Sequence, residues 1–120
     1  MKLVDEVEIL GHKIKMYGSI EFPWFIAKDV AEWIDYSKRS NGTYQTQNMV
    51  KHVDDLEKAV KSFNTLGGMQ EAWALTEDGL YECCMRSIKP IAKDIKREIK
   101  KYLKSIRLTG AAIEPGFSET

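Results

Sequence analysis

Cysteine, histidine and long apolar runs are scarce in this sequence of 120 residues. The two cysteines, Cys83 and Cys84, are neighbours in the chain, and adjacent cysteines almost never form a disulfide with each other because the geometry is strained. A reducing compartment therefore fits best. No run of eighteen apolar residues and no N-terminal signal segment is present, so we expect no membrane span and no export by that route. These absences favour a cytoplasmic protein.

The residues that usually carry catalysis or bind metals form no recognisable pattern. His12 and His52 are far apart and have no Cys-x-x-Cys or His-x-x-x-His partner, so no metal site is predicted. Gly67-Gly68 lacks the lysine and hydroxyl residue of a phosphate loop, and a hairpin turn explains it. The two cysteines are expected to be helix residues that are buried or partly buried. We therefore predict no catalytic residue, no metal and no cofactor, and a protein that is not an enzyme.

Net charge is absent as well, because 18 basic residues balance 18 acidic ones. That balance argues against a protein that coats any polyanion. The charge is unevenly distributed, however: residues 86–107 hold nine basic and two acidic groups, a local charge of +7. A neutral protein with such a segment has a directional field that can steer an anionic partner to one face.

Residues 87–110 show the clearest periodicity. Apolar residues recur at steps of three and four, the period of one helix face: Ile88, Ile91, Ala92, Ile95, Ile99, Tyr102, Leu103 and Ile106. They cover roughly 120° of a helical wheel, and basic residues fill roughly 140° opposite: Lys89, Lys93, Lys96, Arg97, Lys100, Lys101, Lys104 and Arg107. Ser87 is available as a cap, Pro90 suits the first turn, and Gly110 is placed to end the helix. A long helix with one apolar and one basic face follows.

The rest of the chain predicts an α+β fold in one domain. Alternating apolar residues predict a hairpin at residues 3–17 and a strand at residues 20–25, whose Phe22, Trp24 and Phe25 are expected in the core. Helical spacing predicts short helices at residues 27–36 and 44–53, and a helix at residues 77–85 that Thr76 caps. A second hairpin is expected at residues 58–75, although residues 58–64 would serve equally well as a helix. Small antiparallel hairpins thus pack with about four helices, the last long and basic.

The basic face of residues 87–110 allows two interpretations. Most lysine-rich helix faces are simply solvated. A surface for an anionic partner is the alternative, because Asp94 and Glu98 lie beside the basic residues and do not interrupt them. Basic and polar side chains in the loop at residues 37–43 would extend such a surface if they share its face. The residues predicted to contact nucleic acid are Lys38, Arg39, Asn41, Lys89, Lys93, Lys96, Arg97, Lys100, Lys104 and Arg107.

Six separated motifs, in order across residues 3–110, resemble the Bro-N domain, which opens many phage antirepressors and the Bro proteins of insect DNA viruses. They are Trp24-Phe25-Ile26-Ala27-Lys28-Asp29-Val30-Ala31, Ile34-Asp35-Tyr36, His52-Val53-Asp54, Gly67-Gly68-Met69-Gln70, Thr76-Glu77-Asp78-Gly79-Leu80-Tyr81, and Ser87-Ile88-Lys89-Pro90-Ile91-Ala92-Lys93 with Ser105-Ile106-Arg107-Leu108-Thr109-Gly110. The resemblance implies a nucleic-acid-binding module at residues 1–110, followed by a flexible tail or linker at 111–120. Five polar motif positions are hard to assign to a core: Lys28, Asp29, Lys89, Lys93 and Arg107.

The resemblance also implies a task and a setting. A phage-type antirepressor relieves repression of lytic genes, so the expected partners are double-stranded DNA, a phage repressor protein, or both, in the cytoplasm of a bacterial host. The alternative to DNA binding is a protein-interaction module that sequesters the repressor. Regulators of duplex DNA are often two-fold symmetric, which favours a homodimer or higher homo-oligomer. Two departures matter: Lys104 stands near a position where the family commonly has proline, and Ile34-Asp35-Tyr36 replaces the usual Leu-Gly-Tyr. Without the proline, the last helix is expected to run unbroken to about Leu108.

Overall fold

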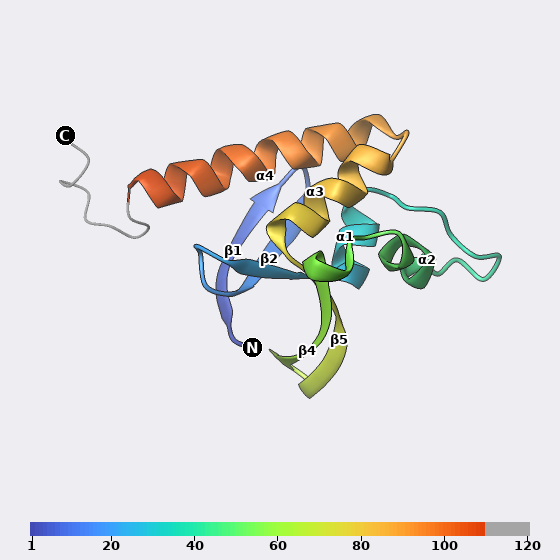
Figure 1. Ribbon diagram of the computed structural model, residues 1–120, viewed down its shortest axis with the longest axis horizontal. Helices are drawn as coiled ribbons and strands as arrows, with labels where there is room; N and C mark the ends of the chain where they lie inside the picture. Colours follow the sequence, from blue (N-terminus) through green and yellow to red (C-terminus); the bar gives the residue numbers. More distant parts are fainter. Residues whose placement is uncertain (110–120) are drawn as a thin grey trace.

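The computed structural model describes residues 1–109, which form a five-stranded sheet with helices packed against it (Figure 1). The elements in chain order are β1 (Leu3–Ile9), β2 (His12–Gly18), β3 (Pro23–Ile26), α1 (Ala27–Trp33), α2 (Thr46–Lys51), the short 3-10 helix η1 (Asp55–Glu57), β4 (Lys58–Thr65), β5 (Gly68–Leu75), α3 (Glu77–Arg86) and α4 (Pro90–Leu108). The predicted α+β class with a long last helix is confirmed. The predicted tail at residues 111–120 and the helix-ending role of Gly110 lie outside the described residues.

All neighbouring strands of the sheet are antiparallel, in the order β1-β2-β3-β5-β4. Both predicted hairpins are present, β1 with β2 and β4 with β5, and the helical alternative for residues 58–64 is wrong. The first hairpin turns at Leu10 and Gly11, whose φ angles of 52° and 83° are the pair of left-handed values that a tight hairpin turn requires. Gly11 adopts such a value at no steric cost.

The chain's first residues connect the two hairpins, whose outer strands β1 and β4 lie at opposite edges of the sheet. The backbone nitrogen of Met1 donates to the carbonyl of Ser62, and the Asn64 nitrogen donates to the Met1 carbonyl over 3.1 Å. Lys2 accepts a bond from the Gly18 nitrogen, also at 3.1 Å. The N-terminus therefore bridges β2 and β4.

Alternation along the strands separates two cores. In β2, Ile14 and Met16 face the helices and belong to the main core, which takes in the buried faces of α1, α3 and α4. Tyr17 points the other way, into a smaller cluster with Phe63 and Ala74. One expected core residue is misplaced: Phe22 is 80% exposed, because it precedes β3 and lies in the connection from β2.

The apolar face of α4 is buried as its periodicity predicts. Ala92, Ile95, Ile99 and Leu103 are fully buried, and the helix runs unbroken to Leu108. Its start was predicted too early. Pro90 is the first helical residue, Ile88 is 97% exposed in the connection from α3, and Ser87 accepts a bond from the Lys89 nitrogen in place of capping the helix.

Helix α3 begins where the sequence predicts, since the Thr76 hydroxyl accepts a bond from the Gly79 nitrogen at 3.1 Å. Helix α1 ends in a Schellman arrangement: the Tyr36 nitrogen bonds to the Ala31 carbonyl and the Asp35 nitrogen to the Glu32 carbonyl. Asp35 therefore holds a left-handed φ of 53° at the position where glycine is usual. The glycine that the motif resemblance implies at this position would adopt the same φ without strain.

Candidate nucleic-acid interface

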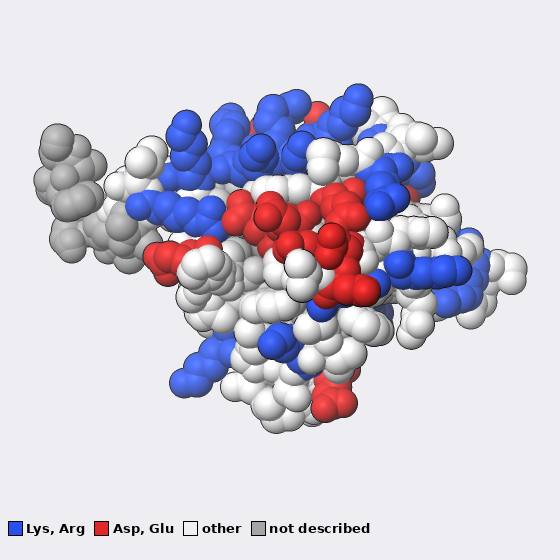
Figure 2. Space-filling model, in the orientation of Figure 1, with Lys and Arg blue, Asp and Glu red and all other residues white. Residues whose placement is uncertain are grey.

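The outer face of α4 carries a continuous line of cations (Figure 2). Four of them, Lys93, Lys96, Lys100 and Lys104, follow each other at steps of three and four along the helix and together form the basic row. Lys93, Lys100 and Lys104 are exposed and Lys96 is half-buried. Among residues 1–109 no carboxylate lies within ion-pair distance of any member of the row. Their charges are thus available to an outside partner.

The two acids of α4 are turned toward other cations of the same helix. Asp94 pairs with Arg97 at 2.8 Å, and Glu98 lies 3.6 Å from Arg97 and 3.8 Å from Lys101. Arg97 is still 61% exposed and Lys101 71% exposed, so these surface pairs bind their partners only weakly. The acids thus pair with two residues of the predicted basic face, Arg97 and Lys101, and leave the four lysines of the basic row without an acidic partner on α4.

Arg107, at the end of the same basic face, has its donors occupied within the chain. Its guanidinium donates to the Ile20 carbonyl at 2.8 and 3.1 Å and pairs with the Glu77 carboxylate at 2.8 Å. The side chain is only 31% exposed. Arg107 thus ties α4 to α3 and to the connection between β2 and β3, which makes it a weaker candidate for DNA contact than the basic row.

Lys89, just before α4, pairs with Asp35 at 2.8 Å and so fastens the start of α4 to the end of α1. This hydrogen bond and the Lys89 charge, together with the nearby charge of Lys38, hold the pKa of Asp35 below its usual value. Asp35 therefore lies close to lysines from both predicted sites, the loop and the helix.

The predicted loop residues form a small closed structure of their own. Lys38 and Tyr44 form an isolated β-bridge, with the Lys38 ammonium 4.9 Å from the centre of the Tyr44 ring. Arg39 donates to the Tyr44 carbonyl at 3.1 Å, and the Asn41 side chain accepts bonds from the backbone and hydroxyl of Thr43. All three predicted residues are exposed, but part of the hydrogen-bonding capacity of Arg39 and Asn41 is used to hold the loop.

The structure arranges the predicted residues as two patches. Figure 2 shows blue atoms along α4 and a second blue group over α2 and the loop before it, with acidic surface over α3 between the lower part of the molecule and α4. Asp35 connects the two patches, because it pairs with Lys89 of one and lies near Lys38 of the other. The basic row alone forms a straight, uninterrupted set, and it is the core of the candidate interface.

A feature that the sequence did not reveal lies beside the basic row. A hollow of about 390 Å³ opens between α3 and α4, with Cys84 and Met85 in its lining and Lys93, Lys96, Arg97 and Lys100 around it. Met85 is 64% exposed. The lysine at its far end, Lys100, also lies 5.5 Å from the centre of the Tyr81 ring. Only the packing of two helices creates this hollow, so no local pattern could have predicted it.

The cysteines behave as structural residues. Both are buried, and burial raises the pKa of the Cys83 thiol and of the Cys84 thiol to about 12. Within residues 1–109, no group of three or more histidine, cysteine or acidic side chains is placed to hold a metal ion. The same part of the chain contains no helix both long and apolar enough to cross a membrane.

Comparison with known proteins agrees with the motif resemblance. The family model for the BRO family, N-terminal domain (Bro-N), matches residues 13–104. A protein of Invertebrate iridescent virus 6 described as Bro-N domain-containing, 289L, is 29% identical over 119 aligned positions. The alignment covers 83% of this chain and 27% of that relative, so the chain spans about a quarter of the relative's length. No solved structure matches the chain.

The matched residues 13–104 extend from the second residue of β2 through most of α4 and include the whole basic row. The family match therefore includes the strands and helices that hold the candidate interface in place. The chain belongs to the BRO family and contains its N-terminal domain, Bro-N.

Proposed function

We propose that this Bro-N domain binds duplex DNA through the basic row of α4 and acts in a phage-type or viral regulator of the antirepressor kind. The observation that carries the proposal is the row itself: four lysines on one exposed helix face, without an acidic partner among the described residues. Since the chain as a whole is neutral, a local patch of this kind directs an anionic partner to one face. The family membership and the flanking cations Arg97 and Lys101 support the same role.

The dimensions of the row suit the DNA backbone. Lys93 and Lys104 are eleven positions apart in the helix, or about 17 Å at 1.5 Å per residue. Duplex DNA advances about 3.4 Å per base pair, so the row follows roughly five base pairs. Four phosphate contacts predict a slope of about −3.6 for the logarithm of the binding constant against the logarithm of salt concentration. Affinity should thus fall about 150-fold between 50 and 200 mM salt.

A fluorescence anisotropy titration with a labelled duplex of about 20 base pairs tests this. The double variant Lys93→Glu/Lys100→Glu removes two of the four contacts and adds two repulsions, so we expect at least a 100-fold loss of affinity at 50 mM salt. Lys13→Glu/Lys51→Glu changes the net charge equally at two exposed lysines elsewhere and is the matched control. Binding that is flat across the salt range, or an equal loss in the control, would contradict DNA binding by the row.

The hollow between α3 and α4 favours a second candidate function, sequestration of a repressor protein without DNA binding. An acidic amphipathic helix of the repressor would place apolar side chains over Met85 and carboxylates on the surrounding lysines. DNA phosphates are charged and would make no favourable contact with that apolar lining.

Met85→Ser separates the two candidates. It removes apolar surface at an exposed position without altering charge, so repressor capture should fall while DNA affinity stays within about twofold. The purified repressor of the same phage is the probe, with and without nuclease treatment. If Met85→Ser leaves capture intact while Lys93→Glu/Lys100→Glu abolishes DNA binding, the sequestration role is lost.

The remaining parts of the proposal follow from the same role. We propose a binding function without catalysis, in the cytoplasm of a bacterial host, with a homodimer or higher homo-oligomer presenting two basic rows to DNA. Sedimentation of the free protein and of the complex measures the subunit number. A strictly monomeric complex with one row on each duplex would contradict the symmetric arrangement.

A further inference from the structure

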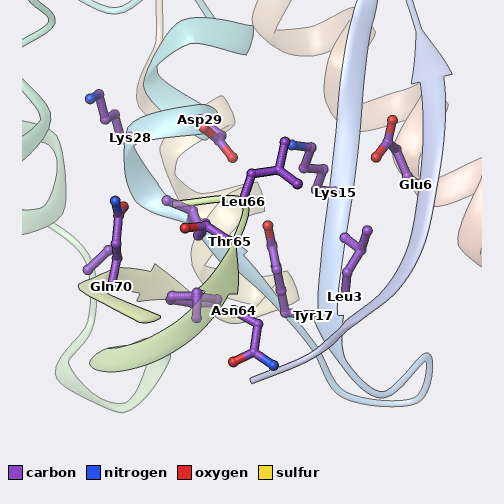
Figure 3. A pocket seen from close by; sticks show the side chains of 13 residues that line it. Leu3, Glu6, Lys15, Tyr17, Lys28, Asp29, Asn64, Thr65, Leu66 and Gln70 are labelled. Atoms are coloured by element: carbon purple, nitrogen blue, oxygen red, sulfur yellow. The ribbon is translucent and has the colours of Figure 1, made fainter. Parts of the chain in front are cut away.

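A separate hollow of about 680 Å³ lies between the two hairpins, on the face of β2 that is turned away from the main core (Figure 3). Residues from β1, β2, β3, α1 and the second hairpin all contribute to its lining. Its floor is apolar, with Phe63, Ile26 and Ala72. A volume of this size is within the range of small-molecule sites.

Tyr17 supplies a buried polar group that faces the hollow. Its ring meets Phe63 edge-on, with 4.7 Å between the centroids, and the residue is only 4% exposed. Figure 3 shows the hydroxyl pointing into the hollow, and none of residues 1–109 forms a hydrogen bond with it. The hydroxyl is therefore free to donate a hydrogen bond to a ligand atom that enters the hollow.

Opposite charges face each other across the same space. Asp29 of α1 is half-buried, and Lys15 of β2 extends over the hollow toward it in Figure 3. Burial raises the pKa of Asp29, and the charge of Lys15 opposes that rise in part. Neither residue forms an ion pair within the described part of the chain. Glu6 and Lys28 also line the hollow, so the site offers two cations and two anions, none of them in an ion pair among the described residues.

We propose that this hollow binds a small zwitterion, a free amino acid or a dipeptide. Its carboxylate would pair with Lys15 and accept the Tyr17 hydroxyl proton in a hydrogen bond, its ammonium group would pair with Asp29, and an apolar side chain would lie over Phe63. Asp29 would repel a simple anion, and Lys15 would repel a simple cation. A neutral sugar would bury both charges without partners. With Glu6 and Lys28 also in the lining, two acidic and two basic side chains surround the hollow, and a ligand with both charges matches them better than an ion of one sign.

The test uses probes that differ by one charge. L-leucine and glycyl-L-leucine are titrated into the full chain and followed by amide chemical shifts around Tyr17 and Lys15. N-acetyl-leucine, which lacks the ammonium charge, and leucinamide, which lacks the carboxylate, are the matched probes. We expect saturable shifts with leucine or the dipeptide, and binding at least tenfold weaker with each single-charge analogue. No shift with either zwitterion, or equal binding of the analogues, overturns the proposal.

Variants locate the site. Tyr17→Phe keeps the ring that packs on Phe63 and removes only the hydroxyl, and Lys15→Met keeps most of the side-chain length; each should weaken binding about tenfold. Lys13→Met, at an exposed position two residues along the same strand and outside the hollow, should leave binding unchanged. Equal affinity in Tyr17→Phe and Lys15→Met overturns the assignment of these roles. Because the basic row lies elsewhere, DNA binding by the same variants stays at the wild-type level, which keeps this test separate from the proposed function.

Discussion

Gly79 gives the sharpest test of the packing around α3. A Cβ atom built on this residue would lie 2.5 Å from the Glu57 carbonyl oxygen, closer than such atoms approach, and 3.2 Å from the Glu57 Cβ. The carbonyl has no freedom to move away at low cost, because it accepts a bond of 3.1 Å from the Thr76 nitrogen. Gly79→Ala therefore forces α3 and η1 apart.

Two effects of opposite sign decide the size of the change. Alanine in a helix interior is about 1 kcal/mol more favourable than glycine. Forcing an extra carbon into a packed contact costs about 3 kcal/mol when the neighbour is backbone, and weakening the bond between Thr76 and Glu57 adds about 1 kcal/mol. The net expectation is a loss of about 3 kcal/mol, or roughly 10 °C in Tm for a domain of this size.

Urea denaturation followed by circular dichroism measures the change in the free energy of unfolding. Ser105→Ala, at an exposed position of α4, is the control and should stay within about 0.5 kcal/mol of the wild type. A Gly79→Ala variant as stable as the wild type, or more stable, would show that η1 and α3 do not meet this closely. Close packing against Glu57 would then no longer explain why glycine occupies this motif position.

Two further substitutions test the ties that position α4. Asp35→Gly relieves a left-handed φ of 53° but removes the pair with Lys89, so the variant should be modestly more stable than the wild type in high salt. Because Lys89 lowers the pKa of Asp35, the ion pair stabilises the fold above the usual aspartate pKa, and this stabilisation is lost as the pH falls. The stability advantage of Asp35→Gly should therefore grow in acid. A variant whose relative stability is lowest in acid or in high salt would contradict this. Arg107→Gln leaves the Glu77 carboxylate and the Ile20 carbonyl without their donor and should cost about 1–2 kcal/mol in urea denaturation, with the salt slope of DNA binding unchanged. A slope reduced by about 0.9 at unchanged stability would instead make Arg107 a phosphate contact.

Local patterns were sufficient to predict most of the fold. Strand β5 and the body of α4 follow from periods of two and of three to four, and the cap by Thr76 follows from its place before two acids. The residues of β4 fit a helix equally well by pattern, and only their pairing with β5 decides between the two. The same patterns failed at junctions. Phe22 and Ile88 fit the apolar pattern but lie in connections, where the backbone has left the strand or helix that would bury them.

Contacts between distant residues were beyond such patterns. Arg107 was predicted on the basic face because of its helical position, yet its guanidinium bonds to Ile20, 87 positions earlier. Likewise, Lys15 and Asp29 face one hollow only because β2 and α1 pack against the second hairpin. The basic row itself was predictable, since one helix defines it. Which of its neighbours have charges free for a partner depends on tertiary structure.

The charges on α3 restrict how a duplex can approach the basic row. Glu77, Asp78 and Glu82 lie on this neighbouring helix, and Figure 2 shows red atoms over α3 directly beside the blue line of α4. Glu77 and Glu82 are partly neutralised by Arg107 and Arg86, whereas Asp78 is exposed. A duplex shifted toward α3 would lose attraction to the row and meet these carboxylates within one Debye length. In the proposed DNA complex the favourable position of the duplex is therefore over the outer side of α4, with the α3 side facing away, and this arrangement requires no net positive charge on the chain.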